Sequence, residues 1–389
     1  MITNKKNILF INGHLNVGGV ERSLVDVLKH FNYNKYNVDL LLLEGTGDYL
    51  AEIPKNVNII NKDTRPAFGP IATSIKQNIR TRNWFAIKYR IILILTNVIG
   101  KKAFKLLPKL LNINKDYDVV IAYRTGIVAD IVAYGVNAKT KLCWWHHGCI
   151  KENDNLSQLT KFNAVIAVSN GIRDLLRYNQ IETEILVIPN IVDIKNIGSK
   201  ANTEQNPFNN FNGLKFITVG RIVEEKHIEN VVAAAIRLKA DNKLKFKWYI
   251  IGDGELYDYI KGLISNANIE DLVILCGSKS NPYPYIKHTD IMVHTSHIES
   301  QGLVIQEAMA LGTPCVVTRS VGPSEFIIDI ENGIMVEPTI DSLISGIYQL
   351  AEDKSLQAKI ANNGISTISQ KYSPETIIKQ IEEVINHEY

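Results

Sequence analysis

Short apolar runs alternate with longer helix-like segments along most of the chain, and this rhythm constrains the fold more than any other feature. In the first half, strand-like runs are expected at residues 7–11, 38–43, 57–60, 118–122, 141–145, 164–168 and 185–188. In the second half, they are expected at residues 215–219, 247–251, 273–276, 291–294 and 314–317. Strands that alternate with helices form parallel sheets covered by helices on both faces. The sequence therefore predicts an α/β protein.

A polar stretch separates the two sets of strands. Residues 202–210 are rich in Asn and contain Pro207, a composition typical of a linker between domains. A chain of 389 residues also suits two domains better than one core. We predict a first domain, a linker and a second domain at residues 1–195, 196–213 and 214–372.

The last segment, residues 373–389, is expected to form a helix. Ser373 is a favoured residue for capping a helix, Pro374 suits the first helical position, and Glu375 places an acid in the first turn.

The overall composition is that of a globular protein, with 46% hydrophobic residues, 21% charged residues and a net charge of +3. We expect neither a signal peptide nor a membrane span, because no apolar run approaches the ~18 residues that a span needs. The cysteines have no C-x-x-C spacing, so we expect buried, reduced thiols in a cytosolic protein. They are Cys143, Cys149, Cys276 and Cys315.

The charge is distributed unevenly. From Thr64 to Lys115 the chain has eleven basic residues and no acidic one, so the remainder carries −8 when the total is +3. Residues 76–111 also contain aromatic and aliphatic residues, and we interpret them as a basic amphipathic region. Within it, residues 101–111 have the composition of a basic amphipathic helix. Such a face can lie on anionic lipid, where each basic residue contributes about 1 kcal/mol. The lysines expected on this membrane or acceptor face are Lys101, Lys102, Lys105 and Lys109.

Two alternatives to a membrane-binding face stay open for the basic region. The segment could be a pair of core helices with a solvated basic side. It could also bind nucleic acid, although nothing else in the chain resembles an RNA or DNA module. We expect an anionic membrane surface as a partner, and no nucleic acid.

Two glutamates eight positions apart, Glu299 and Glu307, form the strongest local motif. A buried strand is expected before them, and a helix is expected over residues 303–311. Glu299 would then lie in a loop at the carboxyl end of a strand, where open α/β sheets bind ligands. The free N–H groups of the first helical turn would attract phosphate. This set suits a sugar nucleotide, with two solvated acids on a surface helix as the alternative.

With its surroundings, the motif resembles the signature of family 4 retaining glycosyltransferases of the GT-B fold, and the resemblance covers nearly the whole chain. The family often has an aromatic residue or glycine after the first glutamate, whereas Ser300 and Gln301 follow here, so the donor sugar stays open. Four further segments match in the family's order: Asn12–Glu21 with its glycine pair, Val219–Arg221 with Lys226, Ile250–Gly254, and Val321–Glu325.

The resemblance implies two Rossmann-like, doubly wound domains that face a central crevice. The first would bind the acceptor and the second the nucleotide-sugar, and the helix at 373–389 would cross back to the N-terminal domain. Domain closure would complete the site and exclude water.

The resemblance also implies roles for individual residues. Arg221 and Lys226 would neutralise the diphosphate as charge develops on it, unless they pair with Glu224 or Glu225. His147, favoured over His146, would lie near the transferred sugar. The implied catalytic residues are Glu299, His147, Arg221 and Lys226. The implied donor-binding residues are Gly18, Gly19, Arg221, Lys226, Asp253, Glu299, Gly302, Leu303, Val304 and Glu307.

We expect no metal and no other cofactor, with the nucleotide-sugar donor as substrate. No His/Cys cluster has metal-ligand spacing, and the Asp116-x-Asp118 pair precedes a strand, at the end away from the expected site. No Ser–His–Asp or Cys–His nucleophile pair is evident either. The resemblance implies front-face attack, in which the departing phosphate assists the acceptor hydroxyl.

These observations predict a hexosyl- or N-acetylhexosaminyltransferase of class EC 2.4. We expect it to move a sugar with retention from a UDP-sugar to a lipid-linked or glycan acceptor in bacterial polysaccharide or capsule assembly. Its expected location is cytoplasmic, peripheral on the inner face of the cell membrane. The alternatives are a soluble glycoside synthase, an epimerase or phosphorylase of the same fold, and a non-catalytic sugar-nucleotide binder.

Overall fold

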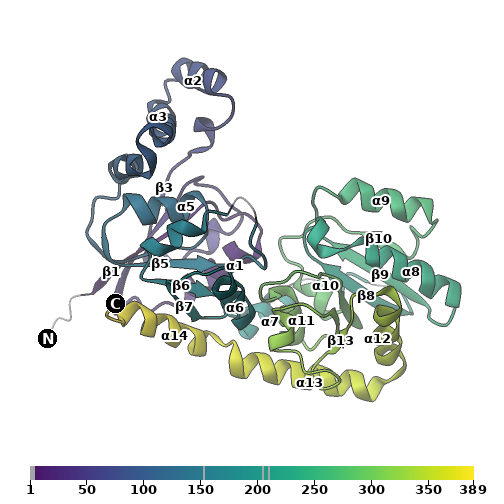
Figure 1. Cartoon of the computed structure of the whole chain (residues 1–389). Helices are drawn as coiled ribbons and strands as arrows, with labels where there is room; N and C mark the ends of the chain where they lie inside the picture. Colours follow the sequence, from purple (N-terminus) through teal and green to yellow (C-terminus); the bar gives the residue numbers. More distant parts are fainter. Residues whose placement is uncertain (1–4, 152–153, 204–205, 209–210) are drawn as a thin grey trace. The chain divides into compact units, whose positions relative to one another are not determined.

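The computed structural model describes residues 5–151, 154–203, 206–208 and 211–389. The chain forms two compact units, and Figure 1 shows the path through each. The first unit is Met1–Pro189 with Ile377–Tyr389, and the second is Asn190–Thr376.

The first unit is built on a seven-stranded parallel sheet with the order β3-β2-β1-β4-β5-β6-β7. The strand order reverses between β1 and β4, so the switch point where such sheets bind ligands lies there. The strands are nearly continuous apolar runs because helices cover both faces. They are β1 Lys6–Asn12, β2 Tyr36–Leu42, β3 Val57–Asn61, β4 Tyr117–Ala122, β5 Ala138–Trp145, β6 Ala164–Ala167 and β7 Glu184–Val187.

Two helices of the first unit, α3 and α6, begin at residues whose side chains cap them. The side chain of Asn83 accepts a hydrogen bond from the N–H of Ala86, and that of Ser169 accepts one from Ile172. The helices are α1 Gly19–His30, α2 Ile71–Arg80, α3 Trp84–Ile99, α4 Leu107–Leu110, α5 Ile127–Asp130, α6 Asn170–Tyr178 and α14 Pro374–Asn386.

The terminal helix α14 packs with the first unit from Ile377 onward. It buries Ile377, Ile381 and Ile385 along one face. An ion pair of 2.9 Å between Glu382 and Lys35 adds to this contact.

Helices α2 and α3 form a hairpin that stands out from the sheet (Figure 1). Only Ala86, Tyr89 and Ile92 of α3 are buried, although most of this helix is apolar. The basic stretch that follows is not one amphipathic helix. A 3-10 turn, η3 Gly100–Leu106, precedes the short α4, because Pro108 can be accommodated only in a first helical turn.

The second unit has a six-stranded parallel sheet with the order β10-β9-β8-β11-β12-β13. Its switch point lies between β8 and β11. The strands are β8 Leu214–Val219, β9 Phe246–Ile251, β10 Val273–Leu275, β11 Ile291–His294, β12 Cys315–Thr318 and β13 Ile334–Val336. The helices are α7 Ile194–Ala201, α8 Glu229–Asp241, α9 Tyr257–Asn266, α10 Tyr283–Lys287, α11 Leu303–Ala310, α12 Ile340–Glu352 and α13 Lys354–Lys371.

The chain passes from the first unit to the second at Pro189, before the linker that the sequence predicts at 196–213. Helix α7 occupies the start of that segment, with Ile197 and Ala201 buried in the second unit. Because the surrounding residues are rich in Asn, the composition of this segment predicted a linker rather than a helix. Residues 204–205 and 209–210 of the predicted linker lie outside the described residues.

Candidate functional site

The loops that follow β8 and β11 bring Lys226 and Glu299 together in the second unit. Their side chains form an ion pair at the carboxyl edge of the sheet, on either side of the switch point. His294, the last residue of β11, also bonds Glu299, with 2.8 Å between His294 Nε2 and Glu299 Oε1. Lys226 therefore pairs with Glu299 rather than with Glu224 or Glu225.

The carboxyl group of Glu299 stays ionised over the whole physiological range. Burial alone would raise its pKa, but Lys226 and His294 outweigh burial and lower the pKa to about 2. Glu299 is thus a permanent hydrogen-bond acceptor at neutral pH. It cannot act there as a general acid.

Hydrogen bonds fix the three loops that surround Glu299. Thr295 Oγ1 donates to the carbonyl of Lys226 at 2.9 Å, and Ser296 Oγ donates to that of Glu225 at 2.8 Å. The N–H of Gly322 donates to the Glu299 carbonyl at 3.1 Å. These bonds tie the ends of β8, β11 and β12 into one preorganised edge.

Helix α11 begins at this edge with two available N–H groups. Gly302 precedes the helix with φ = +82°, a conformation that favours glycine. In the described part of the chain, nothing accepts a hydrogen bond from the N–H groups of Leu303 and Val304. A helix start of this kind attracts phosphate.

Glu307 lies four residues after Leu303, on the same face of α11, and is partly buried. The hydroxyl of Tyr283 donates to Glu307 Oε1 at 2.8 Å. The two predicted glutamates therefore come from the loop and the helix, as the sequence indicates.

Gln301 takes no part in this edge. Its side chain turns into the interior, where its Oε1 accepts from the N–H and the Nδ2 of Asn190 at 2.8 and 2.7 Å. Its Nε2 donates to Gln306 Oε1 at 2.8 Å. The difference from the family pattern at this position is thus absorbed inside the second unit.

Arg221 and Asp253 occupy neighbouring turns beside the same edge. The N–H of Ile222 donates to the Asp253 carbonyl at 2.9 Å, which joins the turns after β8 and β9. Gly254 is required here, because a Cβ atom would lie 2.4 Å from the carbonyl oxygen of Ile222. Both Arg221 and Asp253 have exposed side chains, and no described residue forms an ion pair with the Arg221 guanidinium.

In the first unit, Gly18 and Gly19 follow β1 and begin α1 at that sheet's switch point. A Cβ atom on Gly18 would lie 2.3 Å from Glu21 Oε2. The Glu21 carboxylate is buried and lies 3.5 Å from Arg124 Nη2 and 3.6 Å from His14 Nδ1. Gly18 therefore lets the chain pass closely over a buried acid.

The two histidines after β5 differ in their surroundings. His146 packs against Tyr123, with 5.0 Å between ring centroids, and burial together with His147 and Arg124 lowers its pKa to about 3. His147 is exposed, and its carbonyl accepts from Trp145 Nε1 at 3.0 Å. A neutral, partly buried ring thus packs against Tyr123, while the favoured residue, His147, faces solvent.

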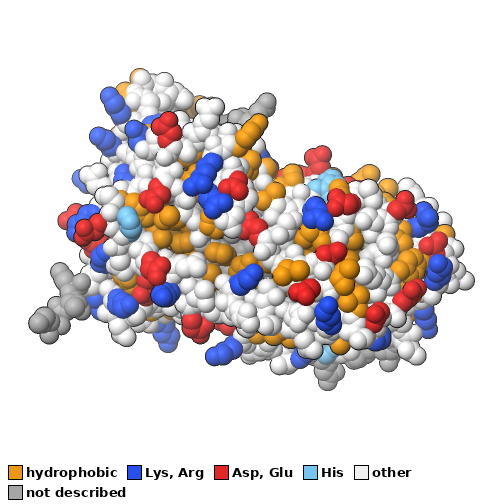
Figure 2. Space-filling model, turned by 60° about the horizontal axis from the view of Figure 1, so that its bottom comes forward, with side chains coloured by type: hydrophobic (Ala, Val, Ile, Leu, Met, Phe, Trp, Pro, Cys, Tyr) orange, Lys and Arg blue, Asp and Glu red, His pale blue; other side chains and the backbone are white. Residues whose placement is uncertain are grey.

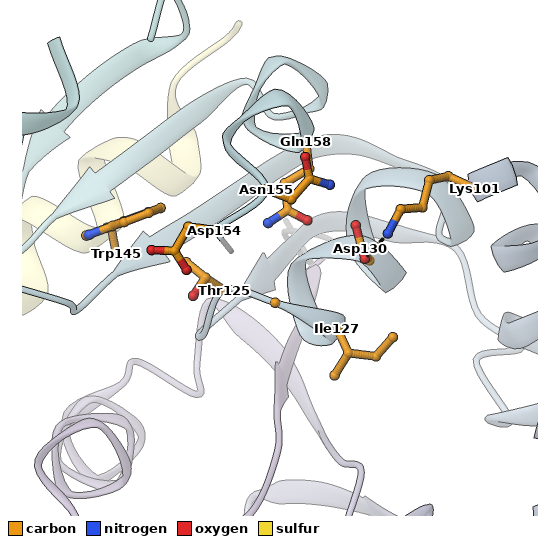
Figure 3. Close-up of a pocket in the computed structure, with 9 residues that line it drawn as sticks. Lys101, Thr125, Ile127, Asp130, Trp145, Asp154, Asn155 and Gln158 are labelled. Carbon is orange, nitrogen blue, oxygen red and sulfur yellow. Dashed lines mark hydrogen bonds and ion pairs between the residues drawn. The ribbon is translucent and has the colours of Figure 1, made fainter. Parts of the chain in front are cut away.

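The four predicted surface lysines do not form one face. Lys101 forms an ion pair with Asp130 and lines a pocket, as Figure 3 shows, whereas Lys102, Lys105 and Lys109 are exposed. The buried residues Ala103, Phe104 and Leu107 anchor this stretch to the first unit.

Metal-ligating groups and reactive thiols do not gather at either sheet edge. Within the described ranges, no three His, Cys, Asp or Glu side chains are grouped so as to hold a metal ion. The cysteines are free, with Cys143 and Cys315 buried and the other two partly so. Burial raises the pKa of both buried thiols to about 12, so they are inert.

Sequence reasoning missed His294, Tyr283 and Asn190. The polar end of β11 was a usable signal for His294, because a buried polar residue at the carboxyl end of a strand often faces a site. Tyr283 reaches Glu307 from α10, and Asn190 holds Gln301 in the interior; no local pattern marks either residue.

Two family models match consecutive parts of the chain. "Glycosyltransferase Family 4" matches residues 17–196, and "Glycosyl transferases group 1" matches residues 200–367. Together they cover both units.

Relatives of known function are also similar to the chain. The poly(ribitol-phosphate) alpha-N-acetylglucosaminyltransferase of Staphylococcus aureus is 32% identical over 60% of this chain. The chain spans 46% of the length of that enzyme and 46% of the length of the Rhizobium meliloti lipopolysaccharide core glycosyltransferase LpsE. A Campylobacter jejuni enzyme, a diphospho-undecaprenol 4-alpha-N-acetylgalactosaminyltransferase, is 27% identical over 90% of this chain and 91% of its own length.

Solved structures share the fold. A mutant of S. aureus TarM, crystallised with fondaparinux, alpha-GlcNAc-glycerol and UDP, has a TM-score of 0.74 and 19% identity, covering 98% of this chain and 100% of that one. Anabaena Alr3699/HepE with UDP and glucose has a TM-score of 0.73 and 20% identity, covering 98% and 99%. The predicted α/β GT-B fold class is confirmed.

No helix in the described residues is long and apolar enough to cross a membrane.

The two matched models, the similar relatives and the shared fold agree with the motifs found along the sequence. The chain belongs to the family 4, group 1 glycosyltransferases.

Proposed function

We propose that the protein transfers a sugar, with retention, from a UDP-sugar to a lipid-linked glycan in bacterial polysaccharide assembly. The main observation behind this proposal is that the Lys226–Glu299 ion pair lies beside the start of α11 at Gly302, at the carboxyl edge of the second sheet. The similar solved structures that contain UDP, and relatives that act on polymers and lipid-linked glycans, support it.

The groups at this edge match the parts of a nucleotide-sugar. Cations and free N–H groups suit a diphosphate, and Lys226, Arg221 and the start of α11 supply both. An ionised carboxylate accepts hydrogen bonds from hydroxyls. We assign Glu299 to the sugar and Glu307 to the ribose.

The proposed chemistry is charge neutralisation rather than proton transfer by Glu299. As the bond from the sugar to the diphosphate breaks, negative charge develops on the leaving phosphate, and Lys226 and Arg221 stabilise it. Front-face attack lets the leaving oxygen take the proton of the acceptor hydroxyl. No metal and no further cofactor is assigned a role.

A membrane surface is the proposed location because apolar and basic side chains gather on the α2–α3 hairpin. Trp84 of α3 is 59% exposed and Val98 is 76% exposed. Lys and Arg side chains lie together in the upper left of Figure 2, the side that carries α2 and α3 in Figure 1. An acid-free segment of this kind suits the inner, anionic face of the cell membrane.

The test is transfer of radiolabelled sugar from UDP-glucose, UDP-N-acetylglucosamine or UDP-N-acetylgalactosamine to lipid-linked glycans extracted from bacterial membranes. We expect incorporation from one of these donors and an α-linkage by NMR, since the donors are α-anomers. The Glu307→Ala variant is expected to lose most of the incorporation while remaining folded. A β-linked product would contradict retention, and wild-type turnover by the variant would contradict the site.

A further inference from the structure

A second concave site lies in the first unit, apart from the residues assigned above. It is a pocket of about 240 Å³ at the carboxyl edge of the sheet, beyond the ends of β4 and β5 (Figure 3). Ligands of α/β sheets bind at this edge. The residues that line it are Lys101, Thr125, Gly126, Ile127, Asp130, Trp145, Asp154, Asn155 and Gln158.

Two buried oxygen atoms among these residues have no donor within the described structure. Gln158 is only 2% exposed, and its Oε1 accepts no hydrogen bond from a described residue. The same holds for Oδ1 of Asp130, whose other oxygen bonds Lys101. Leaving buried acceptors unpaired is unfavourable, so native proteins rarely keep them without a reason. Both atoms are suited to a ligand that donates hydrogen bonds.

The charges around the pocket indicate which donor fits. Lys101 is the cation of the lining, and its ammonium group is already neutralised by Asp130. Asp154 adds a further negative charge, so a phosphate or carboxylate would be repelled. A neutral molecule with hydroxyl or amide N–H groups is favoured instead.

The remaining lining residues suit a ring with both polar and apolar surface. Trp145 and Ile127 provide apolar walls, while Thr125 and Asn155 can each donate and accept hydrogen bonds. Figure 3 shows these side chains around the same space. Apolar walls with a few placed polar groups are the usual composition of a small-molecule site.

We propose that this pocket is a saccharide subsite, which binds one neutral sugar ring of the acceptor glycan through Gln158 and Asp130. The assignment to the acceptor rests on the proposed transferase function. It gives the first unit a selective role, because a ring lacking a donor toward Gln158 Oε1 would leave that oxygen buried and unpaired.

The experiment is saturation-transfer NMR on the full chain with methyl α-glycosides of glucose, N-acetylglucosamine and N-acetylgalactosamine. Inorganic phosphate serves as competitor. The test variant is Gln158→Leu, which keeps the volume of the side chain and removes its hydrogen-bonding groups. The control is Thr160→Val, an exposed change on the same 3-10 turn, Leu156–Lys161, outside the pocket.

We expect at least one glycoside to receive saturation from the wild type and from Thr160→Val. In Gln158→Leu its signal should fall at least tenfold, phosphate should not compete, and the Tm should stay the same or rise because an unpaired buried oxygen is removed. Equal signals from wild type and Gln158→Leu, displacement by phosphate, or no glycoside binding at all would overturn the proposal.

Adding UDP to the same samples separates this proposal from the one on which it rests. If UDP raises the Tm of the wild type but no glycoside binds, only the saccharide subsite is wrong. If glycosides bind with the Gln158 dependence but UDP has no effect, the subsite stands as a sugar site and its assignment to a transferase acceptor is wrong.

Discussion

Glu299 is the residue on which most of the second unit's candidate site depends. Its carboxylate contacts both Lys226 and His294, and its carbonyl accepts from Gly322. The Glu299 carboxylate is therefore already ionised and oriented as a hydrogen-bond acceptor when a donor sugar binds to it. Preorganisation of this kind requires no rearrangement at the moment of reaction.

Replacing Lys226 tests this arrangement. In Lys226→Ala, the Glu299 carboxylate loses its main cation, so the pKa of Glu299 should rise and the free energy of unfolding should fall by about 1–3 kcal/mol. Turnover of the donor should fall at least ~100-fold, as for removal of a group that stabilises a leaving anion. Steady-state kinetics and thermal unfolding measure both effects.

The matched control is Lys215→Ala. Lys215 forms a similar partly buried ion pair with Asp290, at 2.8 Å, but at the amino end of β8. The Lys215→Ala variant should have a lower free energy of unfolding but the same turnover as the wild type. Equal losses of turnover in the two variants would show that activity follows stability and not the Lys226–Glu299 pair.

His146 should make the first unit sensitive to acid. Its pKa is about 3 in the folded protein, below its ordinary 6.5, so the unfolded chain binds the extra proton first as the pH falls. The stability contributed by neutral His146 is complete above pH 6.5 and declines below it. Between pH 7.5 and pH 5 the wild type should lose at most about 2 kcal/mol that His146→Phe retains.

Thermal unfolding of wild type and His146→Phe across this pH range measures the difference. His387→Phe, an exposed change just beyond α14, is the control and should follow the wild type. A constant gap between wild type and His146→Phe from pH 7.5 to pH 5 would show that His146 gains its proton equally easily in both states.

At the residue scale, the sequence predicted the groups that occur in a fixed local spacing. Glu299, Gly302 and Glu307 lie on one loop and helix, so their spacing places them without knowledge of the rest of the fold. The role of Gln301 was not predictable, because Asn190 and Gln306 decide which way it turns. Because Gln301 is bound inside the second unit, its identity does not by itself indicate the donor sugar.

At the scale of elements, the α2–α3 hairpin is the feature that sets the first unit apart from a plain α/β layer. Most residues of α3 are apolar, but only three of them are buried. The other apolar side chains of this helix are therefore partly or fully exposed. A large apolar and basic surface on a protein is typical of an interaction site. Lipid, the partner proposed above, would suit both kinds of side chain.

Replacing Lys102, Lys105 and Lys109 by Gln should release the protein from anionic vesicles. Each lysine near the surface contributes about 1 kcal/mol, so the three together should weaken partitioning on the order of 100-fold. Co-sedimentation with vesicles of phosphatidylglycerol and phosphatidylcholine measures it. Lys101 is left unchanged because it pairs with Asp130.

The control replaces three exposed lysines of α13, Lys354, Lys359 and Lys371, by Gln, which makes the same change in net charge. This variant should bind vesicles as the wild type does. If both triple variants bind equally, the lysines of η3 and α4 do not direct membrane attachment and only net charge matters.

Sequence patterns predicted twelve of the thirteen strands, because strands of parallel sheets are buried on both faces and appear as apolar runs. The exception is β13, only three residues long, which no run of four or more apolar residues marks. The prediction of one helix from Lys101 to Leu111 was wrong. The basic and apolar composition of this stretch fits a helix, but Pro108 forces a new start.

At the scale of the whole molecule, the chain uses one plan twice. Each unit is a parallel sheet whose order reverses beside its first strand, and in each unit polar groups gather at the carboxyl ends next to that reversal. The alternating rhythm predicts this plan, since it fixes parallel pairing. The boundary at Pro189 was not predictable, because α7 lies in a stretch with the composition of a linker.

Binding of a uridine diphosphate sugar to the second unit can be measured by thermal shift with UDP, GDP, ADP and their common sugars. A ligand at 100 times its Kd stabilises the folded state by about 2.7 kcal/mol, which corresponds to roughly 5–10 °C for a unit of this size. We expect such a rise with UDP compounds in the wild type and in Lys215→Ala, and its loss in Lys226→Ala. A rise with GDP or ADP compounds alone, or an equal rise in Lys226→Ala, would contradict it.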